Sequence, residues 1–263
     1  MNILISGAAS GIGLAVCKKL TSLGHSVYAL DVKSVEKMQG VESFEVDVCD
    51  GASLGAIAER LLASGVTLDA IILAAGVHDM ASLVETDFAR IERLIGINLV
   101  GTMRVAHAFH QLLSPRGRFV IVTSEVATYT PMPFNGLYNV SKTALECYAD
   151  ALRQELNLIG QRVVTVRPGA VETPLAKGSA NSTERLALET KLYKNEAKHF
   201  SGIVKKFTGV PMKAEKMAKL IVKAALVRRP HLSYSKHRNP GLVLLSLLPR
   251  RVQCAVIKLL LKR

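Results

Sequence analysis

Short apolar runs alternate along the chain with longer segments in which apolar residues recur every three or four positions. The runs at 70–74 and 119–122 are continuously apolar, which is typical of parallel strands covered by helices on both faces. This alternation predicts an α/β fold with a doubly wound parallel sheet. The predicted strands span 2–6, 26–30, 43–47, 69–74, 117–123 and 162–167, and the predicted helices span 11–23, 52–63, 87–113, 137–159 and 213–227.

A glycine-rich turn follows the first predicted strand and leads into the first predicted helix. Gly7, Gly11 and Gly13 are spaced Gly-x-x-x-Gly-x-Gly, which differs from the common Gly-x-Gly-x-x-Gly fingerprint. Glycines allow a tight turn and a close approach to a pyrophosphate, and a helix N-terminus offers free N–H groups and a positive dipole. The segment therefore favours a dinucleotide site, although a turn without a ligand fits the same pattern.

A tyrosine and a lysine, Tyr138 and Lys142, lie four residues apart in the helix predicted over 137–159. Residues with this spacing share one helix face, so the ammonium would lower the tyrosine's pKa from its usual value of about 10. A tyrosine tuned in this way can move a proton to or from an alcohol or carbonyl oxygen. Alone, the pair fits an exposed face of any amphipathic helix equally well.

Six motifs in order resemble the classical branch of the short-chain dehydrogenase/reductase family, and specifically its hydroxysteroid and retinol dehydrogenases. The resemblance covers residues 1 to about 235 and implies a Rossmann-type fold that binds NAD or NADP. The motifs are the glycine turn, Asp47-Val48, the segment 73–76, Asn98, the Tyr138/Lys142 pair, and the segment 167–169 before Thr173.

The resemblance also implies roles for individual residues. Tyr138 would be the acid/base, and Lys142 would lower its pKa and hold the nicotinamide ribose. Asn98 would hold a water in a proton relay, and a serine would hydrogen-bond the reacting oxygen. The family's serine usually lies thirteen residues before the tyrosine, where this chain has Glu125. We expect Ser124 to serve through a one-residue bulge, and the alternative is an altered polarising group at Glu125.

The end of the second predicted strand bears on the choice of cofactor. Asp31 lies there, and an acid at this position binds the adenosine ribose and repels a 2′-phosphate. NAD is therefore favoured over NADP, although Lys33 could neutralise a phosphate. The complete predicted cofactor set is Gly7, Ser10, Gly11, Ile12, Gly13, Asp31, Asp47, Val48, Ala74, Ala75, Gly76, Asn98, Tyr138, Lys142, Pro168, Gly169, Val171 and Thr173.

Two segments after the predicted core are expected to serve other purposes. The insert at 174–212 corresponds in the family to a mobile lid, whose apolar residues either line a lipophilic pocket or anchor a helix. The segment 239–263 combines leucine-rich stretches with basic residues and is too short to span a bilayer. It fits an interfacial helix on an anionic membrane, or a segment packed on its own subunit or across a dimer interface.

Composition narrows the possible partners and surroundings. The 263 residues carry a formal net charge of +13, concentrated after residue 191, but no nucleic-acid motif accompanies it. We therefore expect no nucleic-acid partner, and no cluster has metal-ligand spacing. The four cysteines lack a Cys-x-x-Cys pair and read as free, mostly buried thiols of a cytoplasmic protein. Because the chain starts on a strand, no cleaved secretory signal is expected.

These patterns together predict one dinucleotide-binding domain over 1–238, followed by the tail at 239–263. The expected activity is interconversion of a secondary alcohol and a ketone with NAD(P), on a lipophilic steroid-, retinoid- or lipid-like substrate. An isomerase or lyase with bound NAD, or a non-catalytic NAD-sensing or membrane scaffold, is the alternative. The expected assembly is a homodimer or homotetramer.

Overall fold

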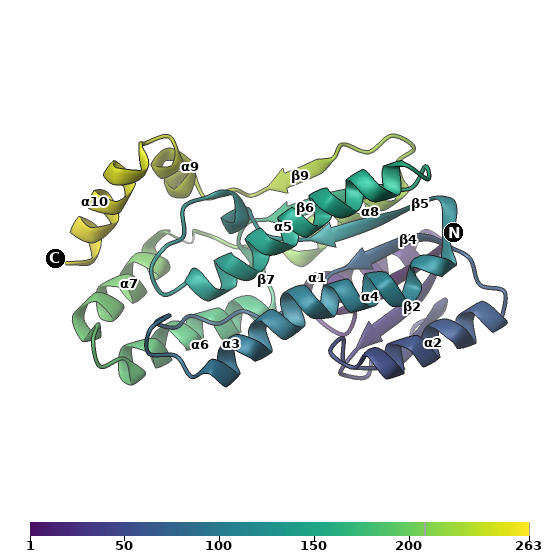
Figure 1. The fold of residues 1–263 in the computed structure, drawn as a ribbon, viewed down its shortest axis with the longest axis horizontal. Helices are drawn as coiled ribbons and strands as arrows, with labels where there is room; N and C mark the ends of the chain where they lie inside the picture. The colour runs from purple at the N-terminus through teal and green to yellow at the C-terminus, as the bar shows by residue number, and fades with distance from the viewer. Residues whose placement is uncertain (208, 263) are drawn as a thin grey trace.

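A parallel sheet of seven strands forms the centre of the computed structural model, which describes residues 1–207 and 209–262 (Figure 1). The strand order is β3-β2-β1-β4-β5-β6-β9, so the order reverses beside β1, where such sheets bind ligands at their carboxyl ends. This confirms the predicted doubly wound sheet. The strands are β1 (Asn2–Ser6), β2 (Ser26–Asp31), β3 (Val41–Glu45), β4 (Leu68–Leu73), β5 (Leu113–Val122), β6 (Arg162–Pro168) and β9 (Ser233–Lys236).

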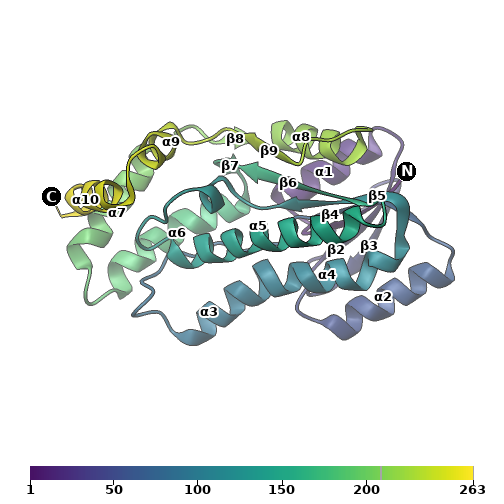
Figure 2. The ribbon, with the colours of Figure 1, turned by 45° about the horizontal axis from the view of Figure 1, so that its top comes forward.

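Helices cover both faces of this sheet (Figure 2). Neighbouring strand residues point to opposite faces, so Ile5 and Ile72 enter one apolar core while Leu4 and Ile71 enter the other. This two-sided burial explains why the strands are continuously apolar. The first core lies beneath α1 (Gly11–Thr21) and α8 (Ala214–Leu226), and the second beneath α2 (Gly51–Ala63), α4 (Thr102–Phe109) and α5 (Gly136–Asn157).

The helix predicted over 87–113 is wrong as one continuous element. It consists of α3 (Phe88–Ile95), the π-helical segment η1 (Gly96–Gly101), α4 and a short 3₁₀ turn, η2 (His110–Leu112). π-helical turns often occur at functional sites, and this one carries Asn98.

The strands differ from the prediction in smaller ways. Strand β3 begins and ends two residues before its predicted span of 43–47, and β5 begins at Leu113 instead of residue 117. Strand β9 was not predicted, because its four residues are mostly polar, with two partly buried and two exposed, and so form no apolar run.

Four helices gather at the end of the molecule toward which the strands point, and we call them the cap (Figures 1 and 2). A separate apolar cluster, which includes Phe200, Ile257 and Leu261, joins the cap helices to one another. Thr208 of the predicted insert and Arg263 of the tail lie outside the described residues. The cap consists of α6 (Pro174–Glu189), α7 (Lys194–Phe207), α9 (Pro240–Ser246) and α10 (Arg250–Leu261), and a two-strand pair, β7 (Val171–Glu172) with β8 (Met212–Lys213), lies beside it.

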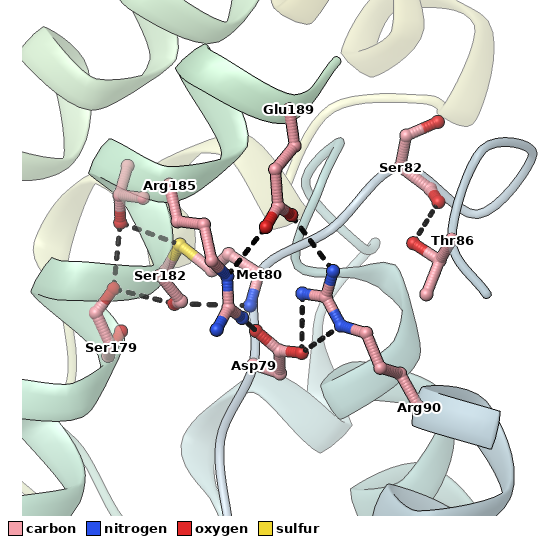
Figure 3. A network of polar contacts seen from close by, with 10 residues as sticks. Asp79, Met80, Ser82, Thr86, Arg90, Ser179, Ser182, Arg185 and Glu189 are labelled. Atoms are coloured by element: carbon pink, nitrogen blue, oxygen red, sulfur yellow. Dashed lines mark hydrogen bonds and ion pairs between the residues drawn. The ribbon is translucent and has the colours of Figure 1, made fainter.

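An ion-pair network fastens the first cap helix to the rest of the molecule (Figure 3). Asp79 binds Arg90 of α3 at 2.8 Å and Arg185 of α6 at 2.6 Å, and Glu189 binds Arg90 at 2.9 Å. Beside it, the Met80 N–H donates to the hydroxyl of Ser182. The insert that the resemblance likened to a lid is therefore two helices, and the second half of the first helix is anchored by these contacts.

The remaining structural predictions concern thiols and the membrane. All four cysteines are free, but only Cys17 is buried, while Cys147 and Cys254 are exposed, so the expectation of mostly buried thiols is wrong. Within residues 1–207 and 209–262, no helix is both long enough and apolar enough to cross a membrane.

Candidate active site

A cavity of about 1740 Å³ runs from the carboxyl ends of the strands into the cap. The glycine turn and Asp31 line one end, Ser124 and Tyr138 the middle, and cap residues such as Leu245 the other end. The cavity therefore brings together residues that are far apart in the sequence. Every residue predicted for catalysis or cofactor binding lines it except Asn98, which lies directly behind its wall.

The glycine turn packs so closely that side chains would not fit. A Cβ on Gly13 would lie 1.9 Å from the carbonyl oxygen of Gly7, and one on Gly7 would lie 2.7 Å from the backbone of Ala75. Gly7 and Gly11 also have positive φ values, of 75° and 52°. Ser10 makes no side-chain cap at the start of α1, so the first N–H groups of this helix remain available to a ligand. This geometry fits a dinucleotide pyrophosphate.

Asp31 lies at the end of β2, against the glycine turn. Its carboxylate accepts hydrogen bonds from the backbone N–H of Ala9 at 2.9 Å and of Lys33 at 3.0 Å. Asp47 follows β3 and accepts a 2.8 Å bond from the N–H of Cys49. Both carboxylates are thereby fixed at the end of the cavity where a dinucleotide would place its adenosine half.

Tyr138 and Ser124 both line the middle of the cavity, and the Ser124 side chain lies close enough to influence the pKa of the phenol. Both are buried, at 8 % exposure each. Burial raises the pKa of Tyr138 to about 12, and the nearby Ser124 side chain opposes this rise. The pKa therefore lies above its ordinary value rather than below it, and the phenol holds its proton at neutral pH.

Lys142 lies one turn along α5 from Tyr138 and is also buried. Its Nζ donates to the carbonyl of Val122 at 3.1 Å and lies 5.8 Å from the centre of the Tyr138 ring. Burial lowers the pKa of Lys142 to about 8, and the carboxylate of Glu146 opposes that change. Because Glu146 is bound in turn by Arg167 through two bonds of 2.8 and 2.9 Å, it neutralises Lys142 only in part.

Asn98 connects the strand end to the helices beneath it. Its Oδ1 accepts from the Val77 N–H at 2.8 Å, and its Nδ2 donates to the Val77 carbonyl at 2.9 Å and to the Ser141 hydroxyl at 3.0 Å. Both amide protons are therefore already used. The contacts fix the segment 74–77 against α5, close enough that a Cβ on Gly76 would lie 3.2 Å from Asn98 Oδ1.

Glu125, the neighbour of Ser124 in the sequence, binds the tail. Its Oε2 accepts a 2.7 Å bond from the N–H of Asn239, the residue that caps α9. Next to it, Arg238 donates to the hydroxyl of Tyr129 at 2.7 Å. Burial raises the pKa of Glu125. The two neighbouring candidates are thus separated in space, with Ser124 at the tyrosine and Glu125 at the base of the cap.

The segment after β6 closes the cavity from the other side. A Cβ on Gly169 would lie 1.8 Å from the carbonyl oxygen of His237, so only glycine allows the tail to pass this closely. The hydroxyl of Thr173 accepts from the Ala176 N–H at 3.2 Å and so caps α6, while its methyl group lies against Gly11. Pro168 and Val171 line the wall between these two points.

Sequence reasoning missed His78, which lines the cavity beside Tyr138. The two ring centroids are 4.2 Å apart. Burial lowers the pKa of His78 to about 4, so the ring is neutral near pH 7. No motif or spacing marked this histidine, and its only signal was its position two residues after Gly76.

The far end of the cavity is apolar and belongs to the cap. Its wall combines residues of α7, α9 and α10. The sequence left the apolar residues of the insert at 174–212, which contains α7, undecided between a pocket lining and a helix anchor. The structure gives both roles to Phe200, which packs in the cap cluster and also lines the cavity. The other apolar lining residues here are Ile203, Val204, Leu242, Leu244, Leu245, Leu248, Val256 and Leu260.

Comparison with known proteins agrees with this architecture. The family model described as short chain dehydrogenase matches residues 1–184. A Schizosaccharomyces pombe protein named NADPH-dependent 1-acyldihydroxyacetone phosphate reductase is 32% identical over 201 residues, covering 73% of this chain and 67% of that protein. A Helicobacter pylori protein named probable short-chain type dehydrogenase/reductase VdlC is 30% identical over 220 residues, covering 81% of each.

Solved structures share the fold. A short chain dehydrogenase from Burkholderia cenocepacia, determined in complex with NADP, superposes with a TM-score of 0.75 at 17% sequence identity. The match covers 97% of this chain and 96% of that one. At this level of identity the likeness concerns the fold alone.

Proposed function

The chain belongs to the short chain dehydrogenase family, and we propose that it interconverts a secondary alcohol and a ketone with Tyr138 as the acid/base. Membership of the family makes the protein an oxidoreductase that uses NAD or NADP. The observation that carries the assignment of Tyr138 is that its buried side chain lies beside that of Ser124 on the wall of the cavity, in the middle of its length.

The residues on the cavity wall divide the reaction between them. The glycine turn, Asp31 and Asp47 would hold the cofactor, which supplies hydride exchange when bound. Ser124 orients the reacting oxygen, and Tyr138 moves the proton at its phenol oxygen. With a pKa of about 12 the phenol is protonated, which suits proton donation to a ketone oxygen. Asn98 acts as a positioning residue, because its amide holds the segment 74–77.

For the cofactor, we propose NAD in preference to NADP. The Asp31 carboxylate is held in place by two backbone N–H groups, and its charge opposes a 2′-phosphate. The names of one relative and one structural neighbour mention NADPH and NADP, and these describe those proteins. Lys33 lines the same end of the cavity and is the group that would favour NADP.

For the substrate, we propose a lipophilic molecule whose apolar part lies under the cap. The cap end of the cavity is formed by leucine, isoleucine, valine and phenylalanine side chains, and burial of apolar surface is the largest source of affinity such a wall can offer. The Schizosaccharomyces pombe relative is named for an acylated ketone, which is consistent with this class.

The test is reduction of unbranched 2-alkanones of increasing chain length by NADH and by NADPH, followed through the absorbance of the reduced cofactor. We expect turnover with NADH and a kcat/KM that rises with chain length, because each added methylene buries apolar surface. Binding of NADH without turnover of any ketone or secondary alcohol would contradict the proposed chemistry. Equal kcat/KM values across chain lengths would contradict only the lipophilic substrate.

We also propose that the tail contacts anionic membrane surfaces. Leu244 of α9, Leu247 directly after it and Leu259 of α10 are exposed at 69%, 76% and 68%, and exposed Arg250 and Arg251 lie between Leu247 and Leu259 in the sequence. Apolar side chains bury at an interface, and basic residues add attraction to anionic lipid. This charge complementarity supports a lipid surface as the partner.

Charge reversal tests the membrane proposal without removing the tail. Arg250→Glu/Arg251→Glu should lose most binding to vesicles of phosphatidylcholine with phosphatidylserine, measured by co-sedimentation at low salt. Lys216→Glu/Lys219→Glu on α8 changes the net charge equally at exposed positions of another helix and is the matched control. Equal loss in both variants would show attraction by net charge alone. No binding of the wild-type protein would contradict the proposal.

A further inference from the structure

A row of three polar side chains runs along the buried side of α5. Tyr138, Lys142 and Glu146 follow one another at intervals of four residues, so they share one face of the helix, and all three are buried. Tyr138 and Lys142 line the cavity, whereas Glu146 lies one turn further along the helix and is not part of the cavity wall. A buried carboxylate costs free energy unless it is paired, so its place beside the site calls for an explanation.

The Glu146 carboxylate joins α5 to the ends of two strands. Its Oε1 accepts a hydrogen bond from the hydroxyl of Thr123, which directly follows β5 and precedes Ser124. Arg167 of β6 donates to both of its oxygens, at 2.9 and 2.8 Å. Strands β5 and β6 are neighbours in the sheet. Glu146 therefore fixes the helix of the tyrosine and the lysine against the strand end that carries Ser124.

The charge of Lys142 depends on the same carboxylate. Nζ of Lys142 donates to the uncharged carbonyl of Val122 at 3.1 Å, and burial lowers the pKa of Lys142 to about 8. The other titratable groups that face this ammonium are Tyr138 on the same helix and His78 after β4, and both are uncharged near pH 7. Of these groups, only Glu146 carries a negative charge, which favours the ammonium over the amine.

Arg167 acts on Lys142 in the opposite sense. It binds Glu146 through two hydrogen bonds and so offsets part of the carboxylate's charge. The exposed carboxylate of Asp150, which lies one turn beyond Glu146 on α5, adds negative charge near Arg167. If the Glu146–Arg167 pair served packing alone, loss of either partner would have the same kind of effect. On the charge of Lys142, the two losses have opposite effects.

We propose that Glu146 is a positioning residue for the reaction, which holds α5 against the strand end of Ser124 and keeps the ammonium of Lys142 charged beside Tyr138. The charged ammonium favours the phenolate that remains when Tyr138 gives its proton to a ketone oxygen. This inference rests on the proposed function of the same site, because it concerns the proton that Tyr138 moves.

Acetylation of Lys142 by acetic anhydride measures its charge without any substrate. Only the neutral amine is a nucleophile, so the pH of half-maximal labelling, followed by mass spectrometry, reports the pKa of Lys142. Glu146→Gln keeps an oxygen for Thr123 but loses the charge. Its midpoint should fall by about one pH unit, the low end of the shift that an opposite charge causes, because Arg167 already offsets part of it.

Three further variants separate charge from packing. Arg167→Gln removes a positive charge, so its labelling midpoint should rise. Glu146→Asp keeps the negative charge and should keep the midpoint close to that of the wild-type protein. Asp150→Asn removes an exposed charge from the same helix, two turns from Lys142, and is the matched control, whose midpoint should stay unchanged.

The pH dependence of kcat/KM for reduction of a 2-alkanone links this charge to the reaction. Activity should fall as the pH rises through the pKa of Lys142, because the neutral amine no longer favours the phenolate. This alkaline limb should move with the labelling midpoint, to lower pH in Glu146→Gln and to higher pH in Arg167→Gln.

Four results would overturn the inference. Midpoints that stay in place, or that move in the same direction in Glu146→Gln and Arg167→Gln, would leave Glu146 with a structural role only. An equal shift in Asp150→Asn would show an effect of net charge alone. An alkaline limb that stays in place while the midpoints move would show that the charge has no part in the reaction. These three results leave the proposed function standing, whereas no turnover of any ketone by the wild-type protein would overturn both.

Discussion

The sheet with its covering helices and the cap are built on different principles. Two large apolar cores hold the sheet, and strand residues such as Ile5 and Ile72 are completely buried. The cap has one small cluster of its own, and its tail helices leave Leu244 and Leu247 largely exposed. Its attachments to the rest of the molecule are partly polar, through the Asp79 network and the bond from Asn239 to Glu125, and partly apolar, where Phe134 packs on Tyr193 and Phe200.

The same two regions contribute groups of different expected function to the cavity. Groups that would handle the cofactor and the proton lie on the sheet side, where backbone packing leaves little freedom, as at Gly13. Groups that would choose the substrate lie on the cap side, where one smaller apolar cluster and a few polar contacts hold the helices. A cap can therefore change its lining while the chemistry beneath it is preserved. The following predictions test this separation.

The largest effect is expected from Tyr138→Phe, which removes only the hydroxyl group. Turnover should fall by about 10³-fold or more, because general acid–base catalysis typically contributes 10²- to 10⁴-fold. NADH binding, measured by fluorescence, should stay nearly intact, because the ring and its packing remain. Substantial turnover in this variant would contradict the assignment of Tyr138.

The second-largest effect distinguishes Ser124, beside Tyr138, from its neighbour Glu125, which binds the tail. Ser124→Ala removes the hydroxyl at Tyr138 and should lower kcat by about 10²-fold, as loss of one donor at a reacting oxygen does. Glu125→Ala should lower kcat by only a few-fold, because its carboxylate binds the tail. If Glu125→Ala is the more damaged variant, the polarising group lies at Glu125, which was the alternative left open by the sequence.

The sheet side was largely predictable from the sequence, for a physical reason. Burial on both faces of the sheet requires continuous apolar runs, and the close backbone contacts of the glycine turn exclude any Cβ. Both requirements can be recognised in the sequence. The π-helical turn at Asn98 could not be recognised, because its six residues are too few to establish an apolar period of their own. The position of His78 beside Tyr138 and the bond from Asn239 to Glu125 could not be predicted either, because these contacts join segments that are distant in the sequence. The cap's arrangement was unpredictable for the same reason.

A smaller effect is expected on the choice of cofactor. Asp31→Ala removes the charge that opposes a 2′-phosphate, so the preference for NADH over NADPH in kcat/KM should narrow by about tenfold, on the order of 1.4 kcal/mol. The substitution also removes the acceptor for the Ala9 and Lys33 N–H groups, so binding of both cofactors should weaken somewhat. A wild-type preference for NADPH would show that Lys33 outweighs Asp31.

The smallest effect concerns the attachment of the tail, where Glu125 can be replaced in two ways. Glu125→Gln keeps an oxygen that accepts from the Asn239 N–H, whereas Glu125→Ala leaves that N–H without its partner. Limited proteolysis after residue 239 should therefore be a few-fold faster in the alanine variant and unchanged in the glutamine variant. Equal rates in all three proteins would show that the apolar contacts of α10 with α7 hold the tail by themselves.

The two Glu125 variants also predict a pH dependence with a definite sign. Burial raises the pKa of Glu125 above its ordinary value of 4.5. The raised pKa means that the group's contribution to stability is fully present below pH 4.5 and is lost as the pH rises through the folded-state pKa. The glutamine variant has no such titration, so its Tm should increase relative to wild type as the pH is raised from about 4 toward 7. A difference in Tm that stays constant would mean that Arg238 and the Asn239 N–H compensate the carboxylate fully. In that case the base of the cap would be as well satisfied as the sheet, and the contrast between the two regions would not extend to this contact.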